Sequence, residues 1–141
     1  MAKTAREVMT GGAECIGEQD TIDQAARRLA ELDVGAMPIC GQDERLKGML
    51  TDRDIVVKVI AKGKDPAGTT AGELATQAEV VTIGADDSVD EALRTMTDKK
   101  VRRLPVIDGH KLIGVVSQAD LASEIDKARV GELVEAISAA P

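Results

Sequence analysis

The chain has 141 residues, a formal net charge of -7 at pH 7, and no phenylalanine, tyrosine or tryptophan. This composition argues against a nucleic-acid partner, because single-stranded nucleic acids stack on aromatic rings and phosphate backbones attract positive charge. No apolar stretch reaches the roughly 20 residues of a membrane span, and the N-terminus lacks the apolar run of a signal peptide. We therefore expect a cytoplasmic protein of one domain or two small halves, with no nucleic-acid or membrane partner.

Residues 1–63 are predicted to form a unit of helix, strand, helix, strand, strand and helix. Most helix starts carry a capping box, in which Thr or Ser caps the helix and Glu or Gln three residues later reaches back. The first helix begins at Thr4 and should end at Gly11, and an amphipathic second helix begins at Thr21. A last helix runs from Thr51 to a stop at Gly63. Strands are expected over residues 14–16, 34–40 and 46–50.

The same order of elements returns after a short linker at residues 64–69. The apolar face of the helix at Val89 lies 67 positions after the face that begins at Ile22 (89 − 22 = 67). A proline within an apolar strand recurs at the same interval, at Pro38 and Pro105. This agreement indicates an internal duplication. It places repeat 1 at residues 1–63, repeat 2 at 70–127 and a C-terminal helix at 128–141.

Each repeat should contain a right-handed parallel strand–helix–strand crossover followed by an antiparallel hairpin. The resulting sheet of three strands, with helices on one face, is small. We therefore expect an α/β protein in which the two repeats pack sheet to sheet as a pseudo-twofold pair. The C-terminal helix has no counterpart after repeat 1, and its apolar spacing predicts that it covers a sheet edge or contacts a second chain. Its apolar residues are Val130, Leu133, Val134 and Ile137.

One short motif occurs once in each repeat, where a strand runs into a helix. Each copy has a glycine, two apolar residues, a hydroxyl residue and, three positions later, an aspartate. These parts could hold a sugar and its phosphate, and they could equally cap a helix. The other capping boxes use Glu or Gln, and the shorter Asp should be a weaker capping partner, which favours a ligand contact in addition to capping. The copies are Gly48-Met49-Leu50-Thr51-Asp52-Arg53-Asp54 and Gly114-Val115-Val116-Ser117-Gln118-Ala119-Asp120.

These features together resemble the CBS-domain family, in the tandem arrangement also called a Bateman module. The resemblance rests on an apolar-Pro-apolar strand followed at matching distance by the motif, found twice, and it covers nearly the whole chain. It implies an α/β fold of tandem CBS repeats, each helix-strand-helix-strand-strand-helix. A closer likeness is to stand-alone CBS pairs of stress-responsive bacteria. That likeness rests on both cysteines and on residues 34–40, 48–54, 70–75 and 101–107.

In CBS pairs that bind ligands, adenosine nucleotides or related adenosyl compounds sit in clefts between the repeats. The resemblance therefore implies AMP, ADP or ATP as a regulatory ligand, with no obligatory cofactor. Asp54 and Asp120 would hold ribose hydroxyls, and Thr51 and Ser117 would contact phosphate. The adenine would lie against strand residues near Ile16, Met37, Ile83 and Leu104.

Three arginines are further candidates for the ligand site. Arg53 lies inside the first motif, and Arg102 and Arg103 belong to the densest positive run of an acidic chain. Each could hold a phosphate by bidentate contacts, and a solvated loop is the alternative. The counterpart of the positive run in repeat 1 is nearly neutral, so we expect the two clefts to differ.

Cys15 and Cys40 are expected on neighbouring parallel strands, which lie about 4.8 Å apart and within reach of a disulfide. The bond would close a loop of 25 residues (40 − 15 = 25) and contribute about 3 kcal/mol of stability. Two reduced thiols are the alternative, which the cytoplasm favours. The likeness to stand-alone CBS pairs favours the disulfide over two reduced thiols. The bond would be a stress-linked staple or a redox switch.

No catalytic or metal centre can be assembled from these residues. His110 is the only histidine and follows a turn, whereas a metal site needs several converging ligands. We predict a non-catalytic homodimeric module that senses energy or stress through an adenine nucleotide and acts on an unknown protein partner. The alternative is a nucleotide-independent, redox-responsive stress protein or dimerisation module that uses a Cys15–Cys40 disulfide.

Overall fold

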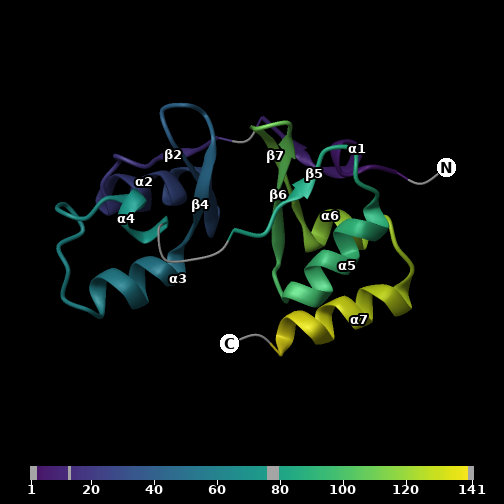
Figure 1. Cartoon of the computed structure of the whole chain (residues 1–141). Coiled ribbons are helices and arrows are strands. Elements are labelled where there is room, and N and C mark those ends of the chain that lie inside the picture. The colour runs from purple at the N-terminus through teal and green to yellow at the C-terminus, as the bar shows by residue number, and fades with distance from the viewer. Residues whose placement is uncertain (1–2, 13, 76–79, 140–141) are drawn as a thin grey trace. The chain divides into compact units, whose positions relative to one another are not determined.

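The computed structural model describes residues 3–12, 14–75 and 80–139. The chain forms two compact units, each with its own core. The middle unit is Glu14–Val80, and the terminal unit combines Met1–Ala13 with Val81–Pro141 (Figure 1). No helix among the described residues is long and apolar enough to cross a membrane.

The middle unit is a three-stranded sheet with short helices. The sheet has the order β2-β3-β4, with β2 parallel to β3 and β3 antiparallel to β4, as the predicted crossover and hairpin require. Its core joins α2 to the sheet through Ile22, Leu29, Ile39 and Leu50. The elements are β2 (Ile16–Gly17), α2 (Ile22–Leu32), β3 (Ala36–Cys40), β4 (Leu46–Thr51), α3 (Asp52–Asp54), the π-helix η1 (Ile55–Ile60) and α4 (Ala71–Ala75).

The terminal unit repeats this plan and extends it by one strand and one helix. Its sheet has the order β1-β7-β6-β5, with β5 parallel to β6 and β6 antiparallel to β7. The β5–β6 register, in which Gly84 lies opposite Ile107, matches the β2–β3 register, in which Gly17 lies opposite Cys40. The elements are α1 (Ala5–Val8), β1 (Thr10–Gly11), β5 (Ile83–Gly84), α5 (Val89–Lys99), β6 (Arg103–Asp108), β7 (Lys111–Ser117), α6 (Gln118–Ala122) and α7 (Lys127–Ser138).

The two sequence repeats exchange their first helices, so neither repeat coincides with a compact unit. Helix α1 belongs to the terminal unit and α4 to the middle unit. Corresponding backbone hydrogen bonds hold both helices in place. In the terminal unit these are Val89 N to Lys3 O, Ala5 N to Asp87 O and Arg6 N to Ala85 O, at 2.9, 2.8 and 3.0 Å. In the middle unit they are Ile22 N to Thr69 O, Ala71 N to Asp20 O and Gly72 N to Glu18 O, at 2.9, 2.8 and 2.9 Å.

The stretch predicted as a linker, residues 64–69, is bound to the middle unit. The carbonyl oxygens of Pro66 and Thr69 accept hydrogen bonds from Asp23 N and Ile22 N, at the start of α2. The predicted boundaries of the repeats, the linker and the C-terminal helix follow the sequence pattern. The boundaries of the compact units differ from them, because the first helices are exchanged. Local sequence signals cannot show this exchange, because a capping box marks where a helix starts and not where it packs.

The glycine that opens each motif has no side chain, and this leaves room for the segment that carries the exchanged helix. A Cβ atom on Gly114 would lie 2.5 Å from Met9 Sδ and 2.7 Å from Thr10 O. A Cβ atom on Gly48 would lie 3.0 Å from the Cβ and 3.2 Å from the Cα of Ala75, at the end of α4. The motif glycine is therefore needed for the close passage of the chain next to the sheet.

The helix that begins at Thr51 differs from its expected form. It starts as the short α3 and continues as the π-helix η1, a form that apolar spacing does not distinguish from an α-helix. Within η1, Val59 is buried in the core, whereas Val56 and Ile60 are exposed. The strand of repeat 2 that corresponds to β2 comprises only Ile83 and Gly84. The pairing of Thr10 and Gly11 with β7, as β1, was not predicted.

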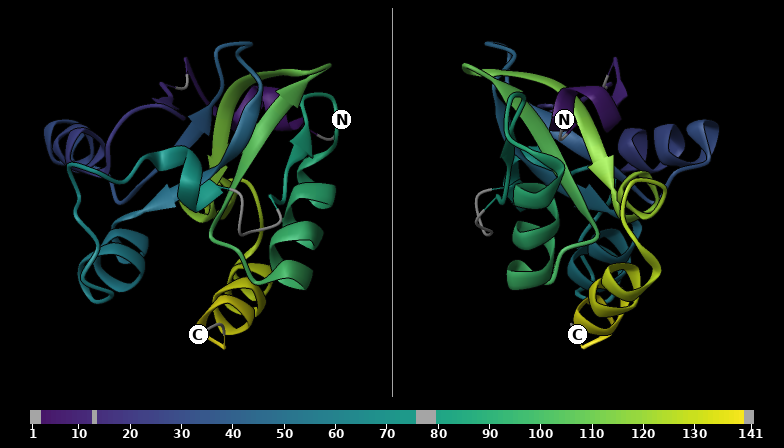
Figure 2. Two further views of the ribbon diagram at one scale, coloured as in Figure 1. Left: turned by 60° about the vertical axis from the view of Figure 1, so that its left-hand side comes forward. Right: turned by 90° about the vertical axis from the view of Figure 1, so that its right-hand side faces the viewer.

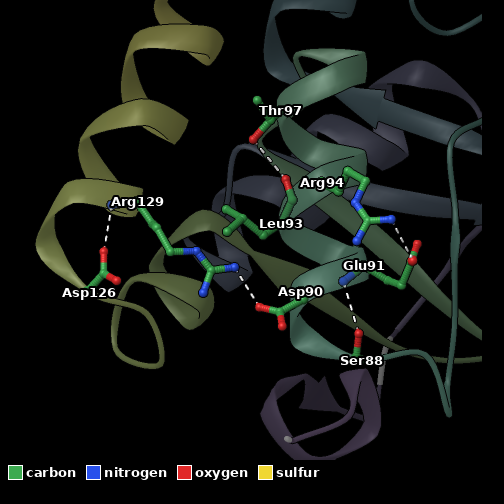
Figure 3. A network of polar contacts seen from close by, with 8 residues as sticks. All are labelled: Ser88, Asp90, Glu91, Leu93, Arg94, Thr97, Asp126 and Arg129. Atoms are coloured by element: carbon green, nitrogen blue, oxygen red, sulfur yellow. Dashed lines mark hydrogen bonds and ion pairs between the residues drawn. The ribbon is translucent and has the colours of Figure 1, made fainter.

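The C-terminal helix α7 packs on α5 and α6 rather than on a sheet edge (Figures 1 and 2). Leu133 and Ile137 enter the core of the terminal unit, whereas Val134 stays exposed. An ion pair of 2.5 Å joins Arg129 of α7 to Asp90 of α5 (Figure 3). The Asp90 carboxylate raises the pKa of Arg129 above its usual value, through a hydrogen bond and charge attraction.

Candidate functional site

Each motif forms the junction between a strand and a helix. Thr51 ends β4 in extended conformation and caps α3, and Ser117 ends β7 and caps α6 in the same way. Asp54 N donates to Thr51 Oγ1 at 3.0 Å, and Thr51 N donates to Asp54 Oδ2 at 3.0 Å. The second junction has the same pair of bonds, 3.1 Å from Asp120 N to Ser117 Oγ and 2.8 Å from Ser117 N to Asp120 Oδ2. The capping role of both motifs is therefore confirmed.

The shorter Asp side chains reach the capped N–H groups as closely as Glu and Gln do at other helix starts. The Asp carboxylates lie 2.8 and 3.0 Å from the capped N–H groups, whereas the carboxylate of Glu7 lies 3.2 Å from Thr4 N and the amide oxygen of Gln24 2.9 Å from Thr21 N. The N–H at each junction lies close enough for the shorter side chain. The choice of Asp therefore gives no separate support for a ligand.

The two motif aspartates differ in what their second oxygen contacts. Asp54 Oδ1 forms an ion pair of 3.2 Å with Lys58 Nζ, one turn further along the helix. Among the described residues, the second oxygen of Asp120 has no recorded hydrogen bond or ion pair. The position corresponding to Lys58 is Glu124 (124 − 58 = 66), and its carboxylate pairs with Lys3 at 3.0 Å. A carboxylate oxygen is therefore open to a donor at the second junction and occupied at the first.

The predicted arginines lie beside the motifs on different elements. Arg103, at the start of β6, is the cross-strand partner of Ser117, and the carbonyl oxygen of Arg102 accepts a hydrogen bond of 2.9 Å from Gln118 N. Arg53 lies within the first motif and is exposed. Positive charge thus comes to the second junction from the neighbouring strand, and to the first from its own helix through Arg53 and Lys58.

Lys58 is a further candidate residue that the sequence pattern did not single out, and it contacts the first motif through Asp54. Its signal was available, because a lysine four residues after an aspartate on a helix commonly forms an ion pair. The structure thus brings together Thr51, Asp54 and Lys58 at one junction, and Ser117, Asp120 and Arg103 at the other.

The strand residues predicted to contact adenine lie in the cores of the two units. Ile16 and Met37 belong to the core of the middle unit, and Ile83 and Leu104 to that of the terminal unit. Their side chains are between 0% and 5% exposed, so they contribute to packing. Their part in a ligand site stays a prediction.

Cys15 and Cys40 are joined by a disulfide in the middle unit, with their Cα atoms 5.6 Å apart. Cys40 ends β3, and Cys15 immediately precedes β2, the parallel neighbour of β3. Arg28 of α2 donates a hydrogen bond of 2.5 Å to the carbonyl oxygen of Cys15 and pairs with Glu14 at 3.2 Å. The helix, the strand and the disulfide thus form one connected group.

The CBS domain family model matches the chain twice, at residues 5–61 and 71–127. The chain therefore belongs to the CBS-domain family and carries a pair of these domains. Hypoxic response protein 1 of Mycobacterium tuberculosis is 47% identical to it over 134 residues, which cover 95% of this chain and 93% of that protein.

Solved structures show the same fold. The crystal structure of Hypoxic Response Protein I with two coordinated zinc ions has a TM-score of 0.80 and 48% identity, covering 88% of this chain and 100% of that chain. The crystal structure of CBSX2 in complex with AMP has a TM-score of 0.73, covers 86% of this chain and 94% of that chain, and is 24% identical. At that identity, the likeness to CBSX2 shows the shared fold alone.

Proposed function

We propose that this CBS pair is a regulatory module that binds an adenine nucleotide, AMP, ADP or ATP, or a related adenosyl compound, at one or both motifs. The observation that carries the proposal is the second junction, where Asp120 has an open carboxylate oxygen and the backbone of Arg102 and Arg103 adjoins Ser117 and Gln118. Ribose presents two neighbouring hydroxyl donors, which a carboxylate can accept, and arginine suits a phosphate. The first junction offers the same groups once Lys58 turns from Asp54 to a phosphate.

Binding would act on the rest of the molecule through the helices that the motifs cap. Thr51 and Asp54 hold the start of α3 and η1, and Ser117 and Asp120 hold the start of α6. A ligand that engages these side chains would bias the position of the helix ends, and a protein partner would sense the change. The module itself would have no catalytic activity. We also propose that it acts as a homodimer.

Replacing Asp120 by asparagine should weaken nucleotide binding at least about tenfold, because a charge-assisted hydrogen bond is lost. Asparagine keeps an oxygen for Ser117 N, so the helix cap should survive. Calorimetric titration with AMP, ADP, ATP and S-adenosylmethionine measures the change, and Asp54→Asn tests the first junction in the same way. The matched control is Asp87→Asn, because Asp87 accepts a hydrogen bond of 2.9 Å from Gly84 N but lies outside both motifs.

Two results would contradict the proposal. One is the absence of binding for all four ligands. The other is an unchanged affinity in both Asp54→Asn and Asp120→Asn. Equal losses in Asp87→Asn and Asp120→Asn would show a general structural effect rather than a ligand contact.

A second candidate function is favoured by the disulfide. A redox-responsive stress module would use the Cys15–Cys40 bond, independently of nucleotide. A thiol count on denatured protein, with and without prior reduction, separates the states, and we expect two thiols only after reduction. Two free thiols under oxidising conditions would end this candidate.

The zinc ions of Hypoxic Response Protein I belong to that protein, and the described residues of this chain do not fit a zinc site. No group of three or more His, Cys, Asp or Glu side chains converges within residues 3–12, 14–75 and 80–139. His110 is exposed in the β6–β7 turn, and both cysteines are bonded to each other. Zinc therefore has no part in the proposed mechanism.

A further inference from the structure

Each compact unit holds its exchanged first helix at the same corner of its sheet, where a short turn follows β2 or β5. In the middle unit, Glu18 in this turn connects the sheet to α4. Its N–H donates a hydrogen bond of 3.0 Å to Cys40 O, and its carbonyl oxygen accepts one of 2.9 Å from Gly72 N. Ala85 makes the same two bonds in the terminal unit, at 2.9 and 3.0 Å. The two corners therefore share one pattern of backbone hydrogen bonds.

The side chains at this corner differ between the units. In the terminal unit, Arg6 of α1 pairs with Asp108, at the end of β6, at 3.1 Å and with Asp86, in the turn, at 3.6 Å. One guanidinium group thus joins the helix, the turn and the strand. Two of the corresponding positions in the middle unit have no side chain, so these ion pairs cannot form there. The three positions are Gly72, Gln19 and Gly41 (72 − 6 = 66; 86 − 19 = 67; 108 − 41 = 67).

The middle unit carries its disulfide at this corner instead. Cys15 immediately precedes β2, and Cys40 ends β3 and accepts the hydrogen bond from Glu18 N. The bond therefore ties the strand that leads into the turn to the strand that holds the turn. The corresponding residues of the terminal unit, Thr82 and Ile107, cannot form such a bond (82 − 15 = 67; 107 − 40 = 67). The disulfide thus takes the place that the Arg6 ion pairs have in the terminal unit.

We infer that the Cys15–Cys40 bond holds the exchanged helix α4 on the sheet, and that its reduction releases the start of this helix. A dithiol reductant supplies two electrons and two protons. Cys15 and Cys40 become thiols, and the dithiol becomes a disulfide. This role rests on the redox-responsive function given above as the second candidate, and it names the element that responds.

Release of the start of α4 follows from what remains at the corner after reduction. Strand β2 then stays beside β3 through the backbone pairing of Ile16 and Gly17, and the turn that carries Glu18 gains freedom to move. Leu74, further along α4, is 6% exposed in the core and keeps the end of the helix in place. The opening is therefore local, and the sheet of the middle unit stays folded.

Amide hydrogen exchange, followed by NMR on the full chain, tests this role at the bonds concerned. Ala71 N and Gly72 N donate to carbonyl oxygens of the turn, at 2.8 and 2.9 Å. In dithiothreitol, we expect these N–H groups to exchange at least about tenfold faster, because the turn is no longer tied to β3. The N–H groups of Ala5 and Arg6, which make the corresponding bonds in the terminal unit, should change by less than about twofold.

The terminal unit provides the converse test. Arg6→Gln removes both ion pairs and keeps the backbone N–H. The N–H groups of residues 5 and 6 should then exchange about two- to fivefold faster, the range expected for exposed ion pairs. Salt at about 1 M should have the same effect on the wild type, because it screens these charges. The N–H groups of Ala71 and Gly72 should respond to neither change.

Moving the disulfide to the other unit tests whether the two devices are equivalent. The variant Thr82→Cys/Ile107→Cys, combined with Cys15→Ala/Cys40→Ala, places the bond in the terminal unit, where the strands pair in the same register. When this chain is oxidised, α1 should no longer respond to Arg6→Gln, and α4 should exchange as in the reduced wild type. The matched control is Cys15→Ala/Cys40→Ala alone, which should not respond to dithiothreitol.

A thiol count on the same samples distinguishes failure of this role from failure of the redox-responsive function. Two free thiols under oxidising conditions would end both. Two thiols that appear on reduction, with unchanged exchange at Ala71 and Gly72, would overturn the role in holding α4 alone. An equal acceleration at Ala5 and Arg6 would also overturn it, because the loosening would then be general.

Discussion

Replacing Gly114 by alanine is expected to destabilise the terminal unit by about 3 kcal/mol, because the added methyl group overpacks a close backbone contact. Its Cβ would lie 2.7 Å from Thr10 O and 2.5 Å from Met9 Sδ, and the Thr10 carbonyl belongs to backbone paired with β7. The N-terminal segment would have to leave the sheet edge, and α1 would be displaced with it. Urea unfolding measures the loss, and limited proteolysis should release the first residues faster than in the wild type.

Two other glycines provide the controls for this change. Gly131, on α7, has nothing within 4 Å of an added Cβ, so Gly131→Ala should stabilise the helix by about 0.5–1 kcal/mol. Gly48→Ala should fall between the two, because its closest contacts, at 3.0 and 3.2 Å, are with Ala75. If Gly114→Ala were as stable as Gly131→Ala, the close passage of the N-terminal segment would be refuted.

Reduction of the Cys15–Cys40 disulfide is expected to lower the free energy of unfolding of the middle unit by about 3 kcal/mol. The bond joins residues with a sequence separation of 25, and opening it increases the conformational entropy of the unfolded chain. The native sheet should nevertheless persist, because Gly84 and Ile107 pair in the terminal unit in the same register without a disulfide. Urea unfolding with and without a phosphine reductant measures the difference.

The variant Cys15→Ala/Cys40→Ala serves as the control for reduction. Its stability should match that of the reduced wild type to within about 1 kcal/mol and should not respond to reductant, since it has no bond to open. A wild type whose unfolding curve is the same in both conditions would contradict the prediction. Loss of all folded signal on reduction would contradict the expectation that the sheet keeps its pairing.

The repeat, the hairpins and the family could be predicted from the sequence because their signals are local and occur twice. Capping boxes located the helix starts, and the recurring prolines and glycines aligned the two copies. The helix exchange could not be predicted in this way, because the contact of Gly114 with Met9 joins residues about 100 positions apart, which no local pattern encodes. The π-helix could not be predicted either. Over six residues, its i to i+5 hydrogen bonding gives no apolar spacing that differs clearly from that of an α-helix.

The candidate site shows the same division between local and distant information. The Thr51–Asp54 and Ser117–Asp120 pairs were predicted directly, since each lies within one turn of chain. The ion pair of Asp54 with Lys58 is local as well, and it distinguishes the first motif from the second, although both carry Asp. The placement of Arg103 opposite Ser117 depends on the β6–β7 register, which the turn at residues 108–109 predicts only in part.

The exchange of first helices has a consequence for how such a chain could arise. The terminal unit combines α1 and β1 of repeat 1 with the elements of repeat 2, and the middle unit combines α4 of repeat 2 with the elements of repeat 1. A chain with a single repeat could complete such a unit only by exchanging its first helix with a second chain. Gene duplication and fusion would place both helices in one chain. If the gene is divided between the repeats, the two encoded fragments should therefore fold only when both are present.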